Sequence, residues 1–268
     1  MSLFRWSCLL GVLLLISGAK PAQANIVWHW PGSFTESEQA KLTHWIELTI
    51  DGVEKKVAPY PFDVHIFFHR LASNKEPVPW ANTQRSGRQA VHFYVDPQYS
   101  LSDFLKDWTA PHELSHLLIP YVGSEYSWFA EGFASYMQYQ VMEAMGVISS
   151  PEVSKRYRRH ISRAKNRFNF HRVPFVSAAS RLQTRGDYVT LYWGGAVYFL
   201  QVDRALKSNG SSLIGVLESY VACCRAKHLS FKYLIQEFDR LSSGTEFSSA
   251  MQAFTSTPGF PAYSEALQ

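Results

Sequence analysis

The amino-acid sequence predicts an α+β fold, because strand-like patterns are concentrated before residue 100 and helical patterns follow. Short runs rich in β-branched and aromatic residues, typical of strands, cover 26–30, 62–69 and 90–95. From Leu101 onward, apolar residues recur at the three- and four-residue spacing of helices. Strands first and helices afterwards is an α+β order. The 268 residues, 46% of them hydrophobic, suffice for one domain with a substantial core.

The first part of the chain, residues 25–100, is expected to be rich in strands and to hold one helix over 35–50. Thr35 and Glu38 have the spacing of a capping box, which marks the start of that helix. Residues 72–88 are polar and contain two prolines and one glycine, so we predict a loop there. The last strand ends at Asp96-Pro97.

The second part, residues 101–268, is predicted to be helical. Its first helical pattern covers 101–118 and contains Pro111, so either the helix kinks there or a new helix starts near Thr109. The other expected helices cover 128–145, 151–168, 188–206, 213–224 and 231–241.

Residues 1–24 have the features of a signal peptide. Arg5 provides a positive start, residues 8–16 are apolar, and Ala22-Gln23-Ala24 fits the small-x-small cleavage pattern. The apolar run is shorter than the ~20 residues that a membrane-spanning helix needs. We therefore expect export to the periplasm or outside the cell, and an uncleaved membrane anchor is the alternative.

The charge of the chain is unevenly distributed. Loss of residues 1–24 removes two bases and no acid, so the formal net charge falls from +4 to +2. Ten bases and no acids lie between Val153 and Gly186: Lys155, Arg156, Arg158, Arg159, Arg163, Lys165, Arg167, Arg172, Arg181 and Arg185. The segment is either a solvated helix face or a patch for anionic membrane lipid, an acidic envelope polymer or an acidic substrate. Nucleic acid suits an exported protein poorly.

Cys223 and Cys224 are the cysteines that would remain after cleavage. Neighbouring cysteines that pair close a strained ring, so we expect two small buried apolar side chains, with a disulfide as the less favoured alternative.

His112-Glu113-Leu114-Ser115-His116 is a His-Glu-x-x-His motif. On a helix, His112 and His116 lie one turn apart on one face, where both imidazoles can bind one zinc ion. Glu113 lies one step around the helix, where it can take a proton from a water at the metal. Apolar neighbours predict a buried helix, in which two histidines and a glutamate are costly unless they bind something.

A third ligand is needed, and Glu131 is the preferred candidate. It lies in the apolar and aromatic stretch Trp128 to Tyr136, where an unpaired carboxylate would be costly. Glu125 competes, but it belongs to a loop-like stretch.

HELSH followed by WFAEGFASY resembles the two zinc-binding helices of gluzincins, in particular the aminopeptidase-N-like and glycyl-aminopeptidase-like families. The resemblance covers about 108–139 and implies a zincin-type metallopeptidase with one zinc ion. It extends weakly to residues 192–196. It implies that Tyr192 stabilises the oxyanion of the reaction. Alternatively, Tyr192 is only an aromatic residue of the core, and Tyr188 is the second candidate for the oxyanion role.

The sequence departs from those families in three places. Fourteen residues separate His116 from Glu131, fewer than is usual in the aminopeptidase-N-like family. The Gly-x-Met-Glu-Asn element that binds a substrate's free amino terminus there is absent, and residues 90–95, the expected substrate-pairing edge strand, carry no carboxylate. Ser135 stands where thermolysin-like enzymes have an aspartate.

The sequence therefore predicts a zinc metallopeptidase that acts on peptides or proteins. Glu113 is the general base, and His112, His116 and Glu131 hold the metal. An inactive zincin-fold binding protein and a zinc amidase acting on cell-wall peptides are the alternatives.

Mass spectrometry of the protein recovered from its native compartment should show an amino terminus near Asn25, because cleavage is expected after Ala22-Gln23-Ala24. A membrane-bound product that retains Met1 would instead identify the segment as an anchor.

Overall fold

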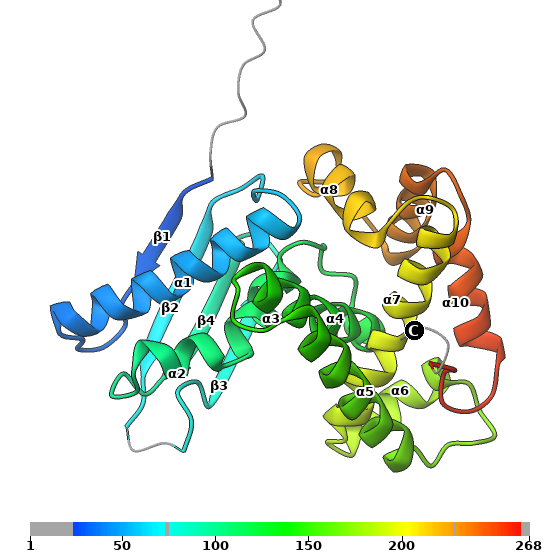
Figure 1. Ribbon diagram of the computed structural model, residues 1–268, viewed down its shortest axis with the longest axis horizontal. Helices are drawn as coiled ribbons and strands as arrows, with labels where there is room; N and C mark the ends of the chain where they lie inside the picture. Colours follow the sequence, from blue (N-terminus) through cyan, green and yellow to red (C-terminus); the bar gives the residue numbers. More distant parts are fainter. Residues whose placement is uncertain (1–23, 73–74, 228, 264–268) are drawn as a thin grey trace, which may run out of the picture.

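A computed structural model describes residues 24–72, 75–227 and 229–263. A sheet covered by one long helix forms one end of the molecule, and a group of helices forms the other (Figure 1). The predicted order of strands followed by helices is confirmed. The predicted signal peptide, apart from Ala24, lies outside the described residues. No described helix combines the length and apolar character needed to cross a membrane.

The described sheet has four strands: β1 (Ile26–His29), β2 (Val64–Arg70), β3 (Trp80–Gln84) and β4 (Ala90–Val95). Their spatial order is β1-β2-β4-β3. β1 and β2 pair in parallel, as do β2 and β4, whereas β3 runs antiparallel to β4.

Two predictions about this sheet were wrong. Residues 72–88 are not all loop, because β3 lies within them. The sequence of β3 lacks the alternation of apolar and polar residues that predicts a strand, since Ala81 is its only buried residue. Residues 90–95 do not form an edge, because β4 lies between β2 and β3. The edge strand on this side of the sheet is β3, which turns back into β4 through Gly87 at a φ of 73°.

Helix α1 (Glu36–Lys56) covers one face of the sheet. It starts as predicted, since the Thr35 side chain accepts a hydrogen bond from the Glu38 backbone and Glu38 accepts one from the Thr35 backbone. It runs six residues beyond the predicted end at Ile50. Trp45 is fully buried against Phe93 of β4, with ring centroids 5.2 Å apart.

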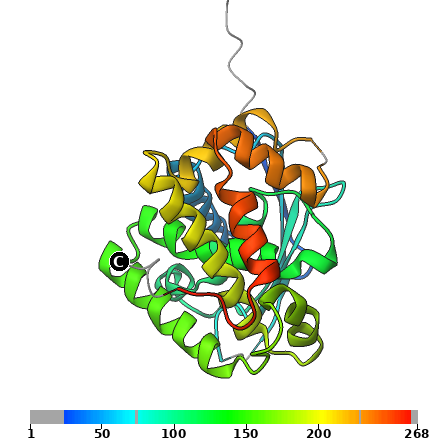
Figure 2. The same ribbon diagram turned by 90° about the vertical axis from the view of Figure 1, so that its right-hand side faces the viewer.

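The helical part has nine α-helices among the described residues, all visible in Figures 1 and 2: α2 (Leu101–Lys106), α3 (Thr109–His116), α4 (Ser127–Ala144), α5 (Ser150–Arg167), α6 (Phe175–Thr184), α7 (Tyr188–Ser208), α8 (Leu213–Cys223), α9 (Phe231–Ser242) and α10 (Glu246–Ser256). Helix α3 begins at Thr109, so Pro111 lies in its first turn, where proline is tolerated. Two helices were not predicted. Helix α10 is rich in serine and threonine and buries only two residues, and α6 is short.

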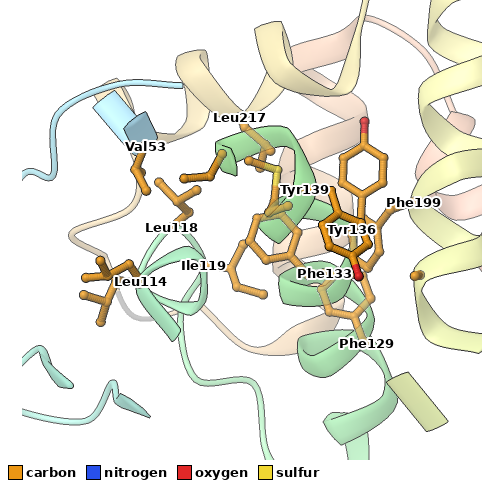
Figure 3. Packing of buried hydrophobic residues seen from close by; sticks show 14 of the residues in the cluster. Val53, Leu114, Leu118, Ile119, Phe129, Phe133, Tyr136, Tyr139, Phe199 and Leu217 are labelled. Carbon is orange, nitrogen blue, oxygen red and sulfur yellow. The ribbon is translucent and has the colours of Figure 1, made fainter. Parts of the chain in front are cut away.

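The core between α3 and α4 fixes the motif helix (Figure 3). Leu114, Leu118 and Ile119 are fully buried; Ile119 lies toward Phe133 of α4, whereas Leu118 lies toward Val53 of α1. Helix α3 thus packs against both α1 and α4, which leaves the histidines to face another direction.

Helices α4 and α7 touch through their backbones. A Cβ atom added at Gly195 would lie 2.0 Å from the Trp128 carbonyl oxygen, and one at Gly132 would lie 2.3 Å from the Gly195 carbonyl carbon. Only glycine permits so close a crossing. Because Glu131 precedes Gly132 and Tyr192 is one turn before Gly195, this crossing places those two residues side by side.

Cys223 and Cys224 form a disulfide, so the prediction of two unpaired buried side chains was wrong. Cys224 is buried but Cys223 is exposed at the carboxyl end of α8, where the backbone leaves helical geometry and can accommodate the small ring.

Gly195→Ala should lower the free energy of unfolding by at least the 1–3 kcal/mol typical of overpacking, because its methyl group would overlap the Trp128 carbonyl. Chemical denaturation measures the change. Gly215→Ala in α8 is the matched control, since its nearest neighbour is a Ser212 hydroxyl at 3.4 Å. It should leave stability within about 1 kcal/mol of wild type. Equal effects of the two substitutions would contradict the close crossing.

Candidate metal centre

Two adjacent helices bring three predicted ligands together. His112 and His116 occupy successive turns of α3, and Glu131 lies on α4, one turn after its start. Glu131 Oε2 lies 3.1 Å from His112 Nε2 and 3.5 Å from His116 Nε2. One ligand atom from each of the three residues falls within 4.8 Å of the other two.

This spacing fits a metal ion. In a tetrahedral shell with bonds of about 2.0–2.1 Å, neighbouring ligand atoms lie roughly 3.3 Å apart. The two measured carboxylate–imidazole distances lie on either side of that value. Both histidines are nearly fully buried, whereas the Glu131 side chain remains 24% exposed, so the group is open to solvent on the carboxylate side.

The other ring nitrogens support the same assignment. Gln138 Oε1 lies 2.9 Å from His112 Nδ1, where it can accept a hydrogen bond from Nδ1–H. This tautomer leaves Nε2 free to bind a metal. Nδ1 of His116 is buried without a hydrogen-bond partner among the described residues. His116 is thus held by packing, and Glu131 is its polar neighbour at the centre.

The charges of this cluster depend on one another. Burial alone lowers the pKa of His112, but the hydrogen bond and charge of Glu131 outweigh it and the net shift is upward. Burial keeps the pKa of His116 below its usual value despite the same carboxylate. Burial also favours the neutral form of Glu131, yet His116 and His112 together hold its pKa well below the usual range. A carboxylate and a neutral imidazole are the forms that bind zinc.

Glu113 lies beside this group but outside it. Its Oε2 is 2.6 Å from the Thr83 hydroxyl, which also lies 2.9 Å from the Glu113 carbonyl oxygen. Thr83 belongs to β3, so the edge of the sheet fixes the orientation of the Glu113 carboxylate. Thr83 was not predicted as a site residue, because β3 itself was not predicted.

Tyr192 of α7 lies over the centre. Its ring stacks on His112, with centroids 5.7 Å apart. Burial raises the pKa of Tyr192 well above its usual value, and the nearby charges of Glu131 and Glu113 add to that shift. Tyr192 therefore keeps its proton and can donate it in a hydrogen bond. Tyr188, the alternative, is 51% exposed at the start of the helix.

Glu125, the competing third ligand, is not part of the group. It lies in a 3₁₀ turn, Ser124–Tyr126, and is exposed. Its carboxylate folds against Gly123 instead, a glycine with a φ of 104°.

Arg85, directly after β3, was missed by sequence analysis. Its Nε and Nη1 atoms are buried and have no hydrogen-bond partner among the described residues. Burial lowers the pKa of its guanidinium, whereas the charges of Glu131 and Glu113 oppose that shift. The centre therefore includes a fixed positive charge close to both carboxylates. Recognising it would have required the hairpin position of residue 85, which the sequence did not indicate.

A cavity of about 390 Å³ adjoins the centre. Its walls include Trp108, Gln138 and Tyr192, each of which contacts His112. Three arginines of the predicted basic segment, Arg156, Arg159 and Arg163 of α5, also line it. The basic segment thus reaches the candidate site as well as the surrounding solvent.

Comparisons with solved structures identify similar folds. An M1 zinc metallopeptidase from Deinococcus radiodurans has a TM-score of 0.52 and 16% identity, over 86% of this chain and 46% of its own. A mutant of the Deinococcus radiodurans enzyme bound to a Tyr-Ser-Ala substrate has a TM-score of 0.54 and 14% identity, over 87% of this chain and 49% of its own. An aminopeptidase N family protein from Idiomarina loihiensis has a TM-score of 0.60 and 17% identity, over 91% of this chain and 46% of its own.

The predicted resemblance to aminopeptidase-N-like gluzincins is therefore confirmed at the level of the fold. The chain spans slightly less than half of the length of these structures. No family model matches the sequence. No curated protein matches it either.

His160, in the cavity wall, should make stability depend on pH. Burial and the neighbouring Arg159, Arg163 and Arg156 lower its pKa to about 4. The unfolded chain takes up a proton on this residue below about pH 6.5, whereas the folded protein does so only near pH 4. The contribution of neutral His160 is therefore complete above pH 6.5 and is lost as the pH falls toward 4.

Urea denaturation at pH 8, 7, 5 and 4 tests this. Wild type should lose on the order of 2 kcal/mol more than His160→Gln between pH 7 and pH 4, while their difference should stay constant between pH 8 and pH 7. Identical pH profiles would show that His160 titrates normally in the folded protein.

Proposed function

We propose that this protein is a zinc-dependent peptidase in which His112, His116 and Glu131 hold one zinc ion and Glu113 is the general base. The observation that carries the proposal is the convergence of three ligand atoms within 4.8 Å while Glu113 stays outside them, beside the group. A structural zinc site has no use for such a base. The names of the similar structures, zinc metallopeptidases and an aminopeptidase N family protein, support the same reaction class.

The three ligands leave one coordination position open, which is typical of catalytic zinc. When bound there, zinc lowers the pKa of a water molecule and polarises the carbonyl group under attack. Gln138 holds the His112 ring in the orientation that this coordination needs, since its Oε1 accepts a hydrogen bond from Nδ1–H.

In this mechanism Glu113 transfers the proton. Its carboxylate accepts the proton of the attacking water and delivers it to the leaving amine nitrogen. The Thr83 hydroxyl occupies one lone pair of Oε2, which fixes the carboxylate plane without protonating it. Tyr192 donates its phenolic hydrogen to the oxyanion that forms from the substrate carbonyl. Its raised pKa keeps that hydrogen in place at neutral pH.

The edge strand β3 is the proposed docking edge for substrate. One side of β3 pairs with β4, and among the described residues no strand pairs with its other side. An extended peptide can therefore add to the sheet through main-chain hydrogen bonds. Thr83 links β3 directly to Glu113, so a peptide bound along this strand lies next to the base. We place the protein outside the cytoplasm, on the signal-peptide features of residues 1–24.

Glu113→Gln should separate catalysis from metal binding. It keeps the size of the side chain but cannot accept a proton, so turnover of a mixed peptide library should fall by at least ~10²–10⁴-fold. Zinc content, measured by atomic emission, should stay near one ion per chain. Tyr192→Phe should cost ~10²–10³-fold for one lost oxyanion donor, with zinc retained.

His112→Ala, His116→Ala and Glu131→Ala are the contrasting variants, which should lose zinc and activity together. Glu125→Ala is the matched control for Glu131→Ala and should retain both. An active Glu113→Gln protein would rule out the mechanism. Zinc bound as tightly in Glu131→Ala as in wild type would mean that the third ligand lies elsewhere.

A further inference from the structure

The cavity beside the metal centre has the chemistry of a binding subsite. Its volume of about 390 Å³ is that of a small-ligand pocket. Tyr192 and Trp108 form the wall that it shares with the centre, since both rings also contact His112. The cavity is therefore next to the centre, close enough for one peptide to place one group in the cavity and another at the metal ligands.

Positive charge dominates the cavity rim. Arg156, Arg159 and Arg163 occur on α5 at intervals of three and four residues, so they share one face of the helix. No acidic residue is among those that line the cavity. Glu152 pairs with Arg156 at 3.1 Å, whereas Arg159 and Arg163 have no acidic partner among the described residues. Arg159 Nη2 lies 3.2 Å from His160 Nε2, which leaves the remaining N–H groups of Arg159 and the guanidinium of Arg163 available to an incoming anion.

The floor of the cavity is aromatic and neutral. Trp193 stacks on His160 at 4.5 Å and on Tyr139 at 5.6 Å, and the Tyr139 hydroxyl lies 3.1 Å from His160 Nε2. The lowered pKa of His160 leaves it uncharged at neutral pH. Positive charge therefore comes from the arginine rim alone, above an apolar floor that lowers the local dielectric and strengthens charged hydrogen bonds.

A larger hollow of about 660 Å³ between α4, α5 and α7 has a different character. Its charged residues pair with one another, as Lys56 does with Glu143 and Lys207 with Asp203. Neither cavity is lined by a candidate ligand itself, but Trp108, Gln138 and Tyr192 of the smaller cavity each contact His112. The smaller cavity is therefore the one that combines arginines lacking an acidic partner with walls that contact the centre.

We propose that this cavity is a specificity subsite for a carboxylate of the peptide substrate, held by Arg159 and Arg163. The inference rests on the proposed peptidase function and names its substrate class, peptides with an acidic group near the scissile bond. Guanidinium groups recognise carboxylates through paired, charge-assisted hydrogen bonds. The carboxylate belongs either to an acidic side chain or to the carboxyl terminus of the peptide, and the two sources predict different substrate preferences.

The test uses the zinc-loaded full chain and matched peptides. One series carries Asp or Asn in turn at each position along the peptide, and a second compares a free carboxyl terminus with its amide. Wild type should prefer the acid of one such pair in kcat/KM by about tenfold or more, as expected for a charged hydrogen bond. Preference within the first series identifies a side chain, and preference within the second identifies the terminus.

Arg159→Glu/Arg163→Glu should abolish or reverse that preference. Arg158→Glu/Lys165→Glu is the matched control, since it makes the same charge change on exposed residues of the same helix that do not line the cavity. The control should keep the preference. Equal loss in both variants would show only a long-range charge effect and overturn the subsite, as would a wild type with no acid preference.

A binding measurement separates this inference from the proposed function. Calorimetry with the zinc-loaded Glu113→Gln protein should show the same preference for acid over amide, and Arg159→Glu/Arg163→Glu in that background should remove it. A wild type that cleaves no peptide, combined with this binding preference, would overturn the peptidase function and keep the subsite. Cleavage of peptides without any binding preference for the acid would overturn the subsite and keep the peptidase function.

Discussion

The contact between the α4 and α7 backbones at Gly132 and Gly195 determines where the polar groups of the centre lie. Helices with side chains at their crossing stand about 8–10 Å apart, and here the absence of side chains permits a closer approach. Glu131 lies next to one glycine, and Tyr192 lies one turn from the other. The carboxylate and the phenol therefore lie together beside the two histidines of α3, which packs against α4 in the core.

A buried cluster of ionisable groups is stable only when its positive and negative charges compensate one another. Two nearly buried imidazoles and a carboxylate would be costly alone, because each loses its hydration. They offset one another through Glu131, whose pKa is held low by His112 and His116. Arg85 adds a positive charge beside Glu131 and Glu113. A divalent cation among the three ligands would complete the compensation, since Nδ1 of His116 is buried and has no hydrogen-bond partner in the described part of the chain.

The parts of this arrangement that depend on local sequence could be predicted, and those that depend on pairing between distant segments could not. The motif helix and the capping box at Thr35 and Glu38 follow from residue spacing within one helix, and Glu131 follows from the cost of an unpaired carboxylate in an apolar, aromatic stretch. Thr83 and Arg85 were not predicted, because β3 has only one buried residue and gains its conformation from pairing with β4. For the same reason β4 was predicted to be the edge strand, whereas β3 lies at that edge. Helix α10 was missed because its serines and threonines favour other conformations, and burial of Phe247 and Phe254 stabilises it instead.

The hydrogen bond from the Thr83 hydroxyl to Glu113 connects the exposed edge of the sheet to the proposed general base. A short edge strand with one unpaired side retains more conformational freedom than the strands inside the sheet. Pairing on that side would remove freedom from Thr83 and hence from the carboxylate it orients. In the proposed mechanism, part of the entropy cost of aligning the base would then fall on substrate association, which would reduce the entropic cost that remains for the chemical step.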